Sequence, residues 1–152
     1  MSEATPSDAR YLARFHHALR RMLHAGDIEA RKVGLTPQQH MLLLGVAGHT
    51  GRGWATISEL AEFLQLRHHS VVGLVDRTQA NGLVRRTVNP ENRREVRVML
   101  TAEGMRKFQA LASFHRKELN VLRKRLDLFR LEDGQPKPQP LRKETGLRRK
   151  QA

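Results

Sequence analysis

Histidine, serine and arginine side chains gather in two short stretches of the chain, and such groups donate hydrogen bonds to base edges and phosphates. The first stretch, RHHSVVGLVDR at 67–77, mixes these donors with small residues, and the second, 85–97, carries five arginines. A valine in the first stretch can also meet a thymine methyl group. The candidate contacts to DNA are His68, His69, Ser70, Val72, Gly73, Arg77, Arg85, Arg86, Arg93, Arg94 and Arg97.

Two helices must position the first stretch. The sequence TISE at 56–59 predicts a capping box, in which the Thr hydroxyl and the Glu carboxylate bond the first free backbone N–H groups of a helix. A second helix is predicted from about 68 to 81, where Asn81-Gly82 gives a left-handed stop. Its inner stripe is predicted to be Val71, Leu74, Val75 and Thr78. This stripe leaves the candidate contacts on the outer face.

The second stretch is predicted to be a β-hairpin. Residues 83–88 and 96–100 have strand patterns, with 89–93 as the turn between them. Arg93 and Arg94 lie at the turn, where long side chains reach furthest, and arginine is favoured in a narrow minor groove. The strand residues are expected to touch phosphates; they are Arg85, Arg86 and Arg97. A hairpin directly after two helices is typical of a winged helix.

The remaining patterns predict a mainly α-helical fold with a small β-hairpin wing. Long helices are expected at about 8–24 and 102–131, with the region of Gly26 ending the first of them. They flank a DNA-binding unit at 54–101 that is preceded by one more helix, which Thr36-Pro37 opens.

The chain is expected to divide into two parts of different character. Residues 1–131 hold all the helical and strand patterns, which predicts one folded domain. Residues 132–152 are rich in proline, glycine and charge, and we expect a disordered basic tail there.

Charge and composition narrow the class of partner. The net charge of +13 and the pI near 11.4 favour a polyanion, and nucleic acid is the commonest one. A membrane surface is disfavoured because no amphipathic helix carries bulky aromatic anchors. With no cysteine, no long apolar run and a polar start, the chain is expected to be soluble and cytoplasmic.

Enzymatic and metal chemistry find little support in the residues. The chain has no phosphate-binding glycine loop and no nucleophile with a nearby base, so we predict neither catalysis nor a cofactor. Its eight histidines include two adjacent pairs, whose members point about 100° apart on a helix. No two histidines lie at i,i+4, and no metal site is therefore expected.

Four stretches resemble the MarR family (multiple antibiotic resistance regulators) in residue types, order and spacing. They are LTPQQHMLLL (35–44), ISELAEFLQL (57–66), LVDRTQANGLVRR (74–86) and PENRREVRVMLTAEG (90–104). The match extends over roughly 4–127. This resemblance implies a winged helix-turn-helix flanked by N- and C-terminal dimerisation helices.

The resemblance also implies a function. It implies a homodimeric, sequence-specific, double-stranded DNA-binding transcriptional regulator, most often a repressor, with recognition helices in major grooves and wing tips in minor grooves. Members of the family often release DNA when a small aromatic or anionic ligand enters a crevice beside the dimerisation helices. Carried onto this chain, the pocket would be lined by Phe15, His40, Met41, Leu44 and Phe108.

Two departures from the family pattern are visible, and the ligands of its zinc-sensing members are matched only in part. Asn92 stands where the family usually has a wing aspartate two residues before its arginine, here Arg94. The apolar helix that usually ends the family's dimer interface is replaced by the basic tail. Zinc-sensing relatives place ligands on the second and last helices, where this chain has only His40 and His115. Without that final apolar helix, dimerisation is expected to rest on residues of the first and last predicted helices. They are Tyr11, Leu12, Phe15, Leu19, Leu23, Leu119, Leu122, Leu126 and Phe129.

Two other readings of the winged helix remain open. It can serve as a protein-interaction module, for which an apolar wing tip would be more natural, or as a coat that binds nucleic acid, including RNA, without regard to sequence. Footprinting separates these readings, because only a sequence-specific regulator protects a discrete site.

Overall fold

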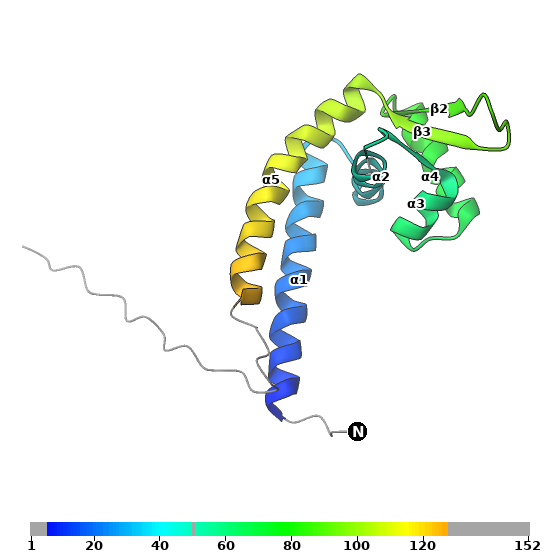
Figure 1. Ribbon diagram of the computed structural model, residues 1–152. Helices are drawn as coiled ribbons and strands as arrows, with labels where there is room; N and C mark the ends of the chain where they lie inside the picture. Colours follow the sequence, from blue (N-terminus) through cyan, green and yellow to red (C-terminus); the bar gives the residue numbers. More distant parts are fainter. Residues whose placement is uncertain (1–5, 50, 128–152) are drawn as a thin grey trace, which may run out of the picture.

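A computed structural model describes residues 6–49 and 51–127, without the side chains of 7 and 125–127. Two long helices form a stalk, and a compact winged unit lies at one end of it (Figure 1). In chain order the elements are α1 (Pro6–Lys32), α2 (Pro37–Gly48), β1 (Trp54–Thr56), α3 (Ile57–Leu64), α4 (His68–Ala80), β2 (Val84–Val88), β3 (Val96–Leu100) and α5 (Ala102–Asp127).

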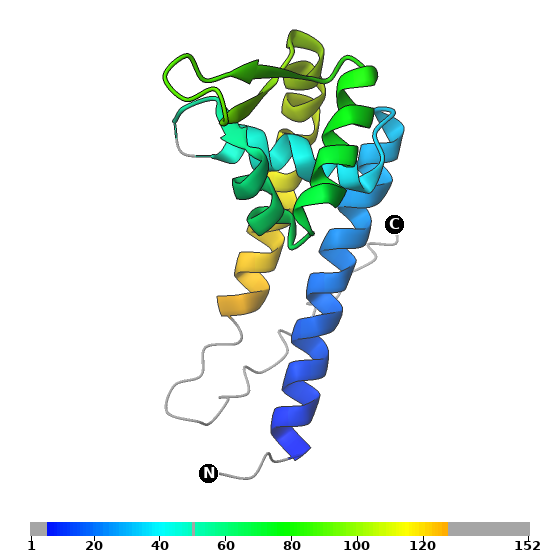
Figure 2. The same ribbon diagram turned by 90° about the vertical axis from the view of Figure 1, so that its right-hand side faces the viewer.

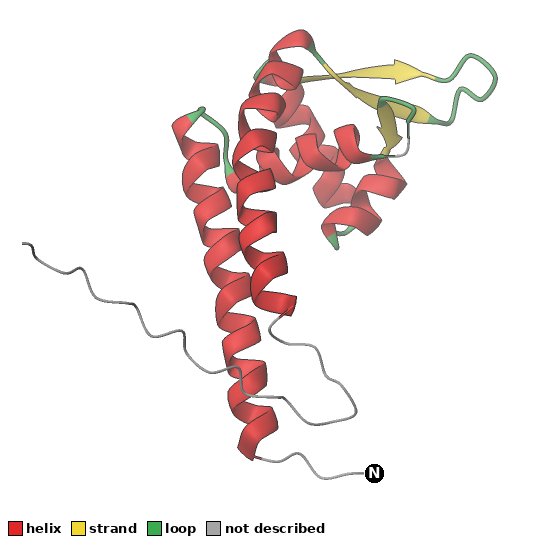
Figure 3. Ribbon diagram, turned by 60° about the vertical axis from the view of Figure 1, so that its left-hand side comes forward, coloured by secondary structure: helices red, strands yellow, loops and turns green. Residues whose placement is uncertain are grey.

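The stalk consists of α1 and α5, which lie side by side in Figures 1 and 3, whereas in Figure 2 the winged unit lies in front of part of α5. The expected end of the first helix near Gly26 is wrong, because α1 continues unbroken to Lys32. Packing overrides the low helix propensity of glycine here. A Cβ on Gly26 would lie 2.8 Å from His115 Cε1, so the missing side chain lets α1 approach α5 closely.

The helix starts follow the sequence prediction closely. Thr56 accepts a hydrogen bond from the backbone N–H of Glu59, and the Glu59 carboxylate accepts one from the Thr56 N–H at 2.8 Å. Thr36 and Gln39 form the same reciprocal pair at the start of α2. Both capping boxes fix helix directions by satisfying N–H groups that have no partner within the helix.

A three-stranded antiparallel sheet in the order β1-β3-β2 supports the wing. β2 and β3 pair from Val84 opposite Leu100 to Val88 opposite Val96. β1 adds to the other side of β3, with Ala55 opposite Val98. The hairpin extends beyond the sheet, away from the stalk (Figure 3).

The hydrophobic core lies inside the winged unit and reaches the top of the stalk. It includes the predicted stripe of α4, together with β-strand residues and Leu111 of α5. Its fully buried large side chains are Leu42, Leu43, Val46, Leu60, Val71, Val75, Leu83, Val84 and Val98.

The last helix is described as far as Asp127, where a helix to 131 was expected. Residues 128–131 and the predicted basic tail at 132–152 lie outside the described residues, so both remain predictions. Among the described helices, none combines the length and the apolar character needed to cross a bilayer.

Candidate nucleic-acid interface

Helix α4 divides into an anchored face and an open face. Val71, Leu74, Val75 and Thr78 are buried, as predicted, and the Thr78 hydroxyl donates to the Leu74 carbonyl at 2.7 Å. The opposite face is exposed or half-exposed, and it carries the candidate contacts His68, His69, Ser70, Val72, Gly73 and Arg77. The buried stripe therefore fixes the orientation of the donors.

The turn before α4 sets the crossing of the two helices. Gln65 adopts φ 53°, ψ 41°, a left-handed conformation, and the side chain of Gln65 donates to the Glu62 carbonyl at 2.7 Å. Leu66 N–H bonds back to the Ala61 carbonyl. These bonds satisfy the carbonyls at the end of α3 and turn the chain sharply into α4.

A groove of about 510 Å³ lies between α4 and the wing. Thr56 at the end of β1 and Ile57 and Ser58 at the start of α3 also line it, and the sequence analysis had not placed them at the site. Predicted contacts from both regions meet around it. Its other lining residues are His68, Val72, Arg86, Asn92, Arg94, Glu95 and Val96.

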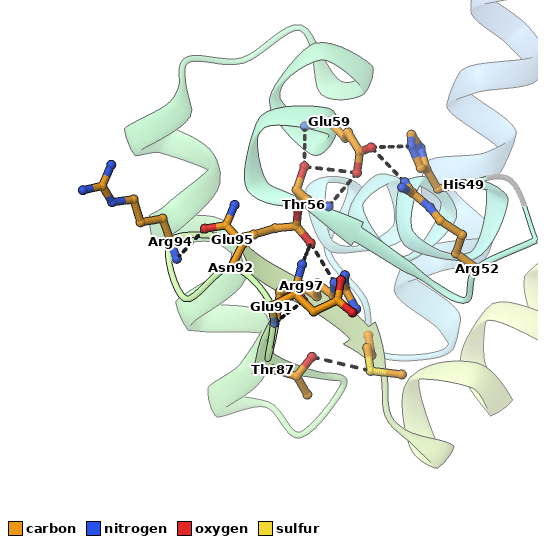
Figure 4. Close-up of polar contacts among 12 residues, drawn as sticks. His49, Arg52, Thr56, Glu59, Thr87, Glu91, Asn92, Arg94, Glu95 and Arg97 are labelled. Atoms are coloured by element: carbon orange, nitrogen blue, oxygen red, sulfur yellow. Dashed lines mark hydrogen bonds and ion pairs between the residues drawn. The ribbon is translucent and has the colours of Figure 1, made fainter.

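Two asparagines shape the wing turn. The Asn89 side chain donates to Glu95 Oε1 at 2.9 Å and accepts from the Glu91 N–H at 3.0 Å. Asn92 Oδ1 accepts from the Arg94 N–H at 3.2 Å. The amide oxygen of Asn92 thus orders the turn through the backbone, without the carboxylate that the family usually has there. The Arg94 side chain projects away from the other residues drawn in Figure 4.

At its base, the wing is held by a cluster around Trp54. The Cζ atoms of Arg52 and Arg97 each lie 4.0 Å from the Trp54 ring centroid, within cation–π range. The Arg97 Nε also donates to Glu95 Oε1 at 2.8 Å. Arg97, expected to touch phosphates, therefore already has protein partners, one of which is the Trp54 ring.

Arg86 has protein partners as well. Its guanidinium pairs with Asp76 on α4 and donates to the Val72 carbonyl at 3.3 Å. The backbone N–H of Arg86 donates to Gln79 Oε1. Arg86 thus ties β2 to α4, whereas Arg85, its neighbour on the strand, is exposed. Alternate strand residues point to opposite faces, which explains the difference.

The start of α3 carries the most perturbed carboxylate. Burial acts to raise the pKa of Glu59, but hydrogen bonds from the Thr56 backbone and from Arg52 outweigh it, and the pKa falls to about 2. His49 Nε2 lies 3.1 Å from the same carboxylate (Figure 4). Glu59 therefore stays ionised and links the loop before β1 to the helix it caps.

A second, apolar pocket of about 410 Å³ lies where α1, α2 and α5 meet. His40, Met41, Leu44 and Phe108 line it, as the resemblance implied. Phe15 does not line it. Because α1 is continuous, Phe15 lies seven residues before Met22 of the lining, about 10 Å along the helix axis.

His40 and His115 meet in this pocket, although 75 residues separate them in sequence. Their Nε2 atoms are 2.9 Å apart and their rings are nearly parallel, at 5°. Burial and then the neighbouring His115 lower the pKa of His40, against a smaller upward effect of Asp27. No cluster of three metal-binding side chains occurs among residues 6–49 and 51–127.

Sequence reasoning missed most of the pocket wall. Because α1 runs past Gly26, both Gly26 and Asp27 line the pocket, and the misplaced helix end hid these two residues. On α5 the i,i+4 series Leu111, His115 and Leu119 was a usable signal. The lining residues not anticipated are Met22, Leu23, Gly26, Asp27, Leu111, Ala112, His115, Arg116 and Leu119.

The fold and the groove define a winged helix-turn-helix protein with a two-helix stalk. A sequence profile of the MarR family matches residues 33–95. The HTH-type transcriptional repressor MdtR of Bacillus subtilis (strain 168) is 35% identical over 78 residues, which is 51% of this chain and 48% of MdtR. The matched part thus spans about half the length of that relative.

Solved structures agree in fold. AbsC, a MarR family transcriptional regulator from Streptomyces coelicolor, superposes with a TM-score of 0.68 at 19% identity, covering 83% of this chain and 84% of AbsC. Sco3205 of the same organism, a MarR family regulator solved in complex with DNA, gives 0.65 at 21% identity, covering 80% and 76%. The profile match and the shared fold make this chain similar to MarR family regulators.

Proposed function

We propose that the protein is a sequence-specific, double-stranded DNA-binding transcriptional regulator. The observation that carries this proposal is the groove between α4 and the wing, where His68 and Val72 face Arg94 across about 510 Å³. A recognition helix in the major groove would place a DNA strand along this groove, with the wing tip over the next minor groove.

The outer face of α4 leaves room for DNA to approach the helix backbone closely. Gly73 lies in its middle, and a Cβ there would meet only Arg77 Nη1 at 3.4 Å, an ordinary contact. Packing within the chain therefore does not require glycine, although glycine costs roughly 1 kcal/mol in a helix. A DNA backbone or base edge against this face accounts for the small residue.

Two of the wing's exposed arginines lie at its tip. Neither Arg93 nor Arg94 forms an ion pair with any residue in 6–49 or 51–127, and both are exposed. Arg85 is exposed as well. We assign these three arginines to DNA, and we assign Arg86 and Arg97 to holding the wing.

The stalk supports a homodimer. Large apolar side chains remain exposed on α1 and α5, in the region that the resemblance assigns to dimerisation. An apolar surface of this kind is stabilised by a partner chain. The exposed side chains are Leu12, Leu23, Ile28, Leu119 and Val121, which are between 41% and 56% accessible.

Repression and release by a ligand complete the proposal. MdtR is named a repressor, and the resemblance makes repression the expected direction for this protein, acting on promoters in the cytoplasm. The apolar pocket lies between the stalk and α2, so a ligand bound there would contact both. A small aromatic or anionic effector bound there would change DNA affinity by favouring one arrangement of the two parts.

The decisive experiment is selection of bound duplexes from random DNA with the full chain. A homodimer predicts a roughly palindromic site with half-sites about 34–36 Å apart, one helical turn. Affinity is expected to fall steeply between low and moderate salt, as several phosphate contacts require. Uniform coverage without an enriched site would favour a nucleic-acid coat, and no binding would favour a protein-interaction module.

A further inference from the structure

The stalk carries more positive charge than the winged unit. Helices α1 and α5 hold 13 lysines and arginines against six aspartates and glutamates, a net charge of +7. Residues 33–101, which include the groove proposed for DNA, hold eight against five, a net charge of +3. Most of the excess of positive charge therefore lies outside the proposed DNA-binding unit.

Basic side chains of α1 form one exposed stripe. Arginines and histidines follow one another at steps of four and three residues, so they share a face of the helix. The members of the stripe, all exposed, are Arg10, Arg14, His17, Arg21 and His24. Residues 9–26 contain no aspartate or glutamate. The stripe therefore presents only positive or titratable basic groups over about 21 Å of helix axis.

A shallow groove of about 230 Å³ between α1 and α5 joins this stripe to a second one on α5. Arg21 lines the groove from α1, and Val121 lines it from α5. Lys117 lies four residues before Val121 and Lys124 three residues after it, so both share its face of α5, and both are exposed. The lining includes one carboxylate, that of Glu118. We call the two stripes together the basic flank of the stalk.

The cations of the basic flank have no carboxylate partner within the described chain. Elsewhere on the stalk such pairs form, as between Lys32 and Glu29 and between Arg106 and Glu103. Four cations of the flank form no ion pair with any residue in 6–49 or 51–127; they are Arg14, Arg21, Lys117 and Lys124. Like charges held close together on rigid helices repel one another, and a polyanion relieves this repulsion.

The basic flank is a surface separate from the groove between α4 and the wing. Both stripes run along the stalk, which extends away from the winged unit (Figure 1). The flank is also separate from the apolar pocket, which Leu23 and Leu119 line from other faces of the same two helices. A duplex held between α4 and the wing therefore leaves the flank open.

We propose that the basic flank binds the phosphate backbone of a second DNA duplex without regard to sequence, so that the protein bridges two segments of DNA. Arginine and lysine side chains in a row contact phosphates and release counterions, which requires no reading of bases. The stripe on α1 has no Trp, Tyr or Phe side chain. It therefore lacks both the anchors that a membrane surface favours and the platforms on which single-stranded bases stack.

The test is capture of a second duplex by the full chain. A duplex that carries the selected site is fixed to beads and loaded with protein, and a labelled duplex that lacks the site is then added. We expect the labelled duplex to be retained only when protein is present. Retention should fall steeply between about 50 and 200 mM salt, because phosphate contacts release counterions.

Two double variants locate the surface. Arg14→Gln/Arg21→Gln is expected to weaken binding of the second duplex about tenfold or more, and to lower the slope of log affinity against log salt by about 2. Arg116→Gln/Arg123→Gln is the matched control, because these arginines are also exposed and seven residues apart, and Arg116 lines the apolar pocket instead. The control should retain the second duplex as the unaltered protein does, and both variants should bind the selected site unchanged.

Three results would each overturn the inference: no retention of the second duplex by the unaltered protein, equal losses in the two double variants, or tighter binding to phosphatidylglycerol vesicles or single-stranded RNA than to the duplex. Thermal melts and sedimentation show that the variants keep their fold and oligomeric state. If selection finds no site, binding of the site-free duplex to the protein alone still compares the two variants. A failure of the basic flank is thus distinguishable from a failure of the proposed regulator function.

Discussion

The tip and the base of the wing use the same residue type in opposite ways. At the base, Arg97 lies against Trp54 and Glu95, and Arg86 pairs with Asp76 on α4. At the tip, Arg93 and Arg94 are exposed and form no ion pair with a described residue. Counting arginines on the hairpin therefore overestimates the number without a protein partner, because Arg86 and Arg97 hold the hairpin in place.

The difference follows from what surrounds each guanidinium. The strand side chains of Arg86 and Arg97 lie within reach of α4 and β1, which offer a carboxylate and an aromatic face. The side chains of Arg93 and Arg94 at the turn are exposed and pair with no carboxylate of the described residues. Geometry thus decides which arginines are available to phosphates, since the charge of all of them is the same.

The largest effect should come from placing a charge in the core that anchors α4. Leu74→Asp puts an unpaired charge on a side chain that is 3% exposed, and is expected to cost about 4 kcal/mol or more of unfolding free energy. Urea denaturation measures it. His69→Asp, on the outer face of the same helix, should leave stability nearly unchanged; equal losses would contradict the assignment of faces.

At the wing tip, a change should affect DNA and not the fold. Arg94→Ala is expected to weaken binding to the selected site by about 1–3 kcal/mol, because it removes a charged contact to the duplex. Fluorescence anisotropy at fixed salt measures it. Arg20→Ala removes one charge from the exposed face of α1 and serves as the matched control. A large drop in Tm for Arg94→Ala would show a structural role instead.

At the wing base, the reverse pattern is expected. Arg97→Ala removes the cation over Trp54 and the partner of Glu95, and should cost about 1 kcal/mol of stability. Trp54 fluorescence should change in the folded state. If Arg97→Ala instead weakened DNA binding as strongly as Arg94→Ala without loss of stability, the distinction between base and tip would be wrong.

The smallest effect should appear on acidification. The pKa of Glu59 is about 2 in the folded protein and near 4.5 in the unfolded chain. Ionised Glu59 therefore stabilises the folded state, and this contribution is fully present above a pH of about 4.5. This contribution is lost as the pH falls from about 4.5 toward 2. Glu59→Gln should flatten that part of the curve of urea midpoint against pH. An unchanged slope would show that the capping carboxylate contributes nothing through its charge.

Local patterns predicted the winged unit well. Thr56 and Glu59 lie three residues apart, and the buried stripe of α4 repeats at helical spacing, so neighbours along the chain suffice to specify both. The interruption at Gly26 was predicted wrongly, because glycine propensity is a local quantity. The close approach of α5 at His115, which favours a glycine there, is not visible in the sequence.

By itself, the amino-acid sequence determined the order of helices and strands, the anchored face of α4, and the basic character of the hairpin, since these depend on spacing, caps and charge. Only the tertiary structure decided which arginines are free and which histidines meet. Such contacts join residues far apart in the chain, and their distances are set by the packing of whole helices against one another.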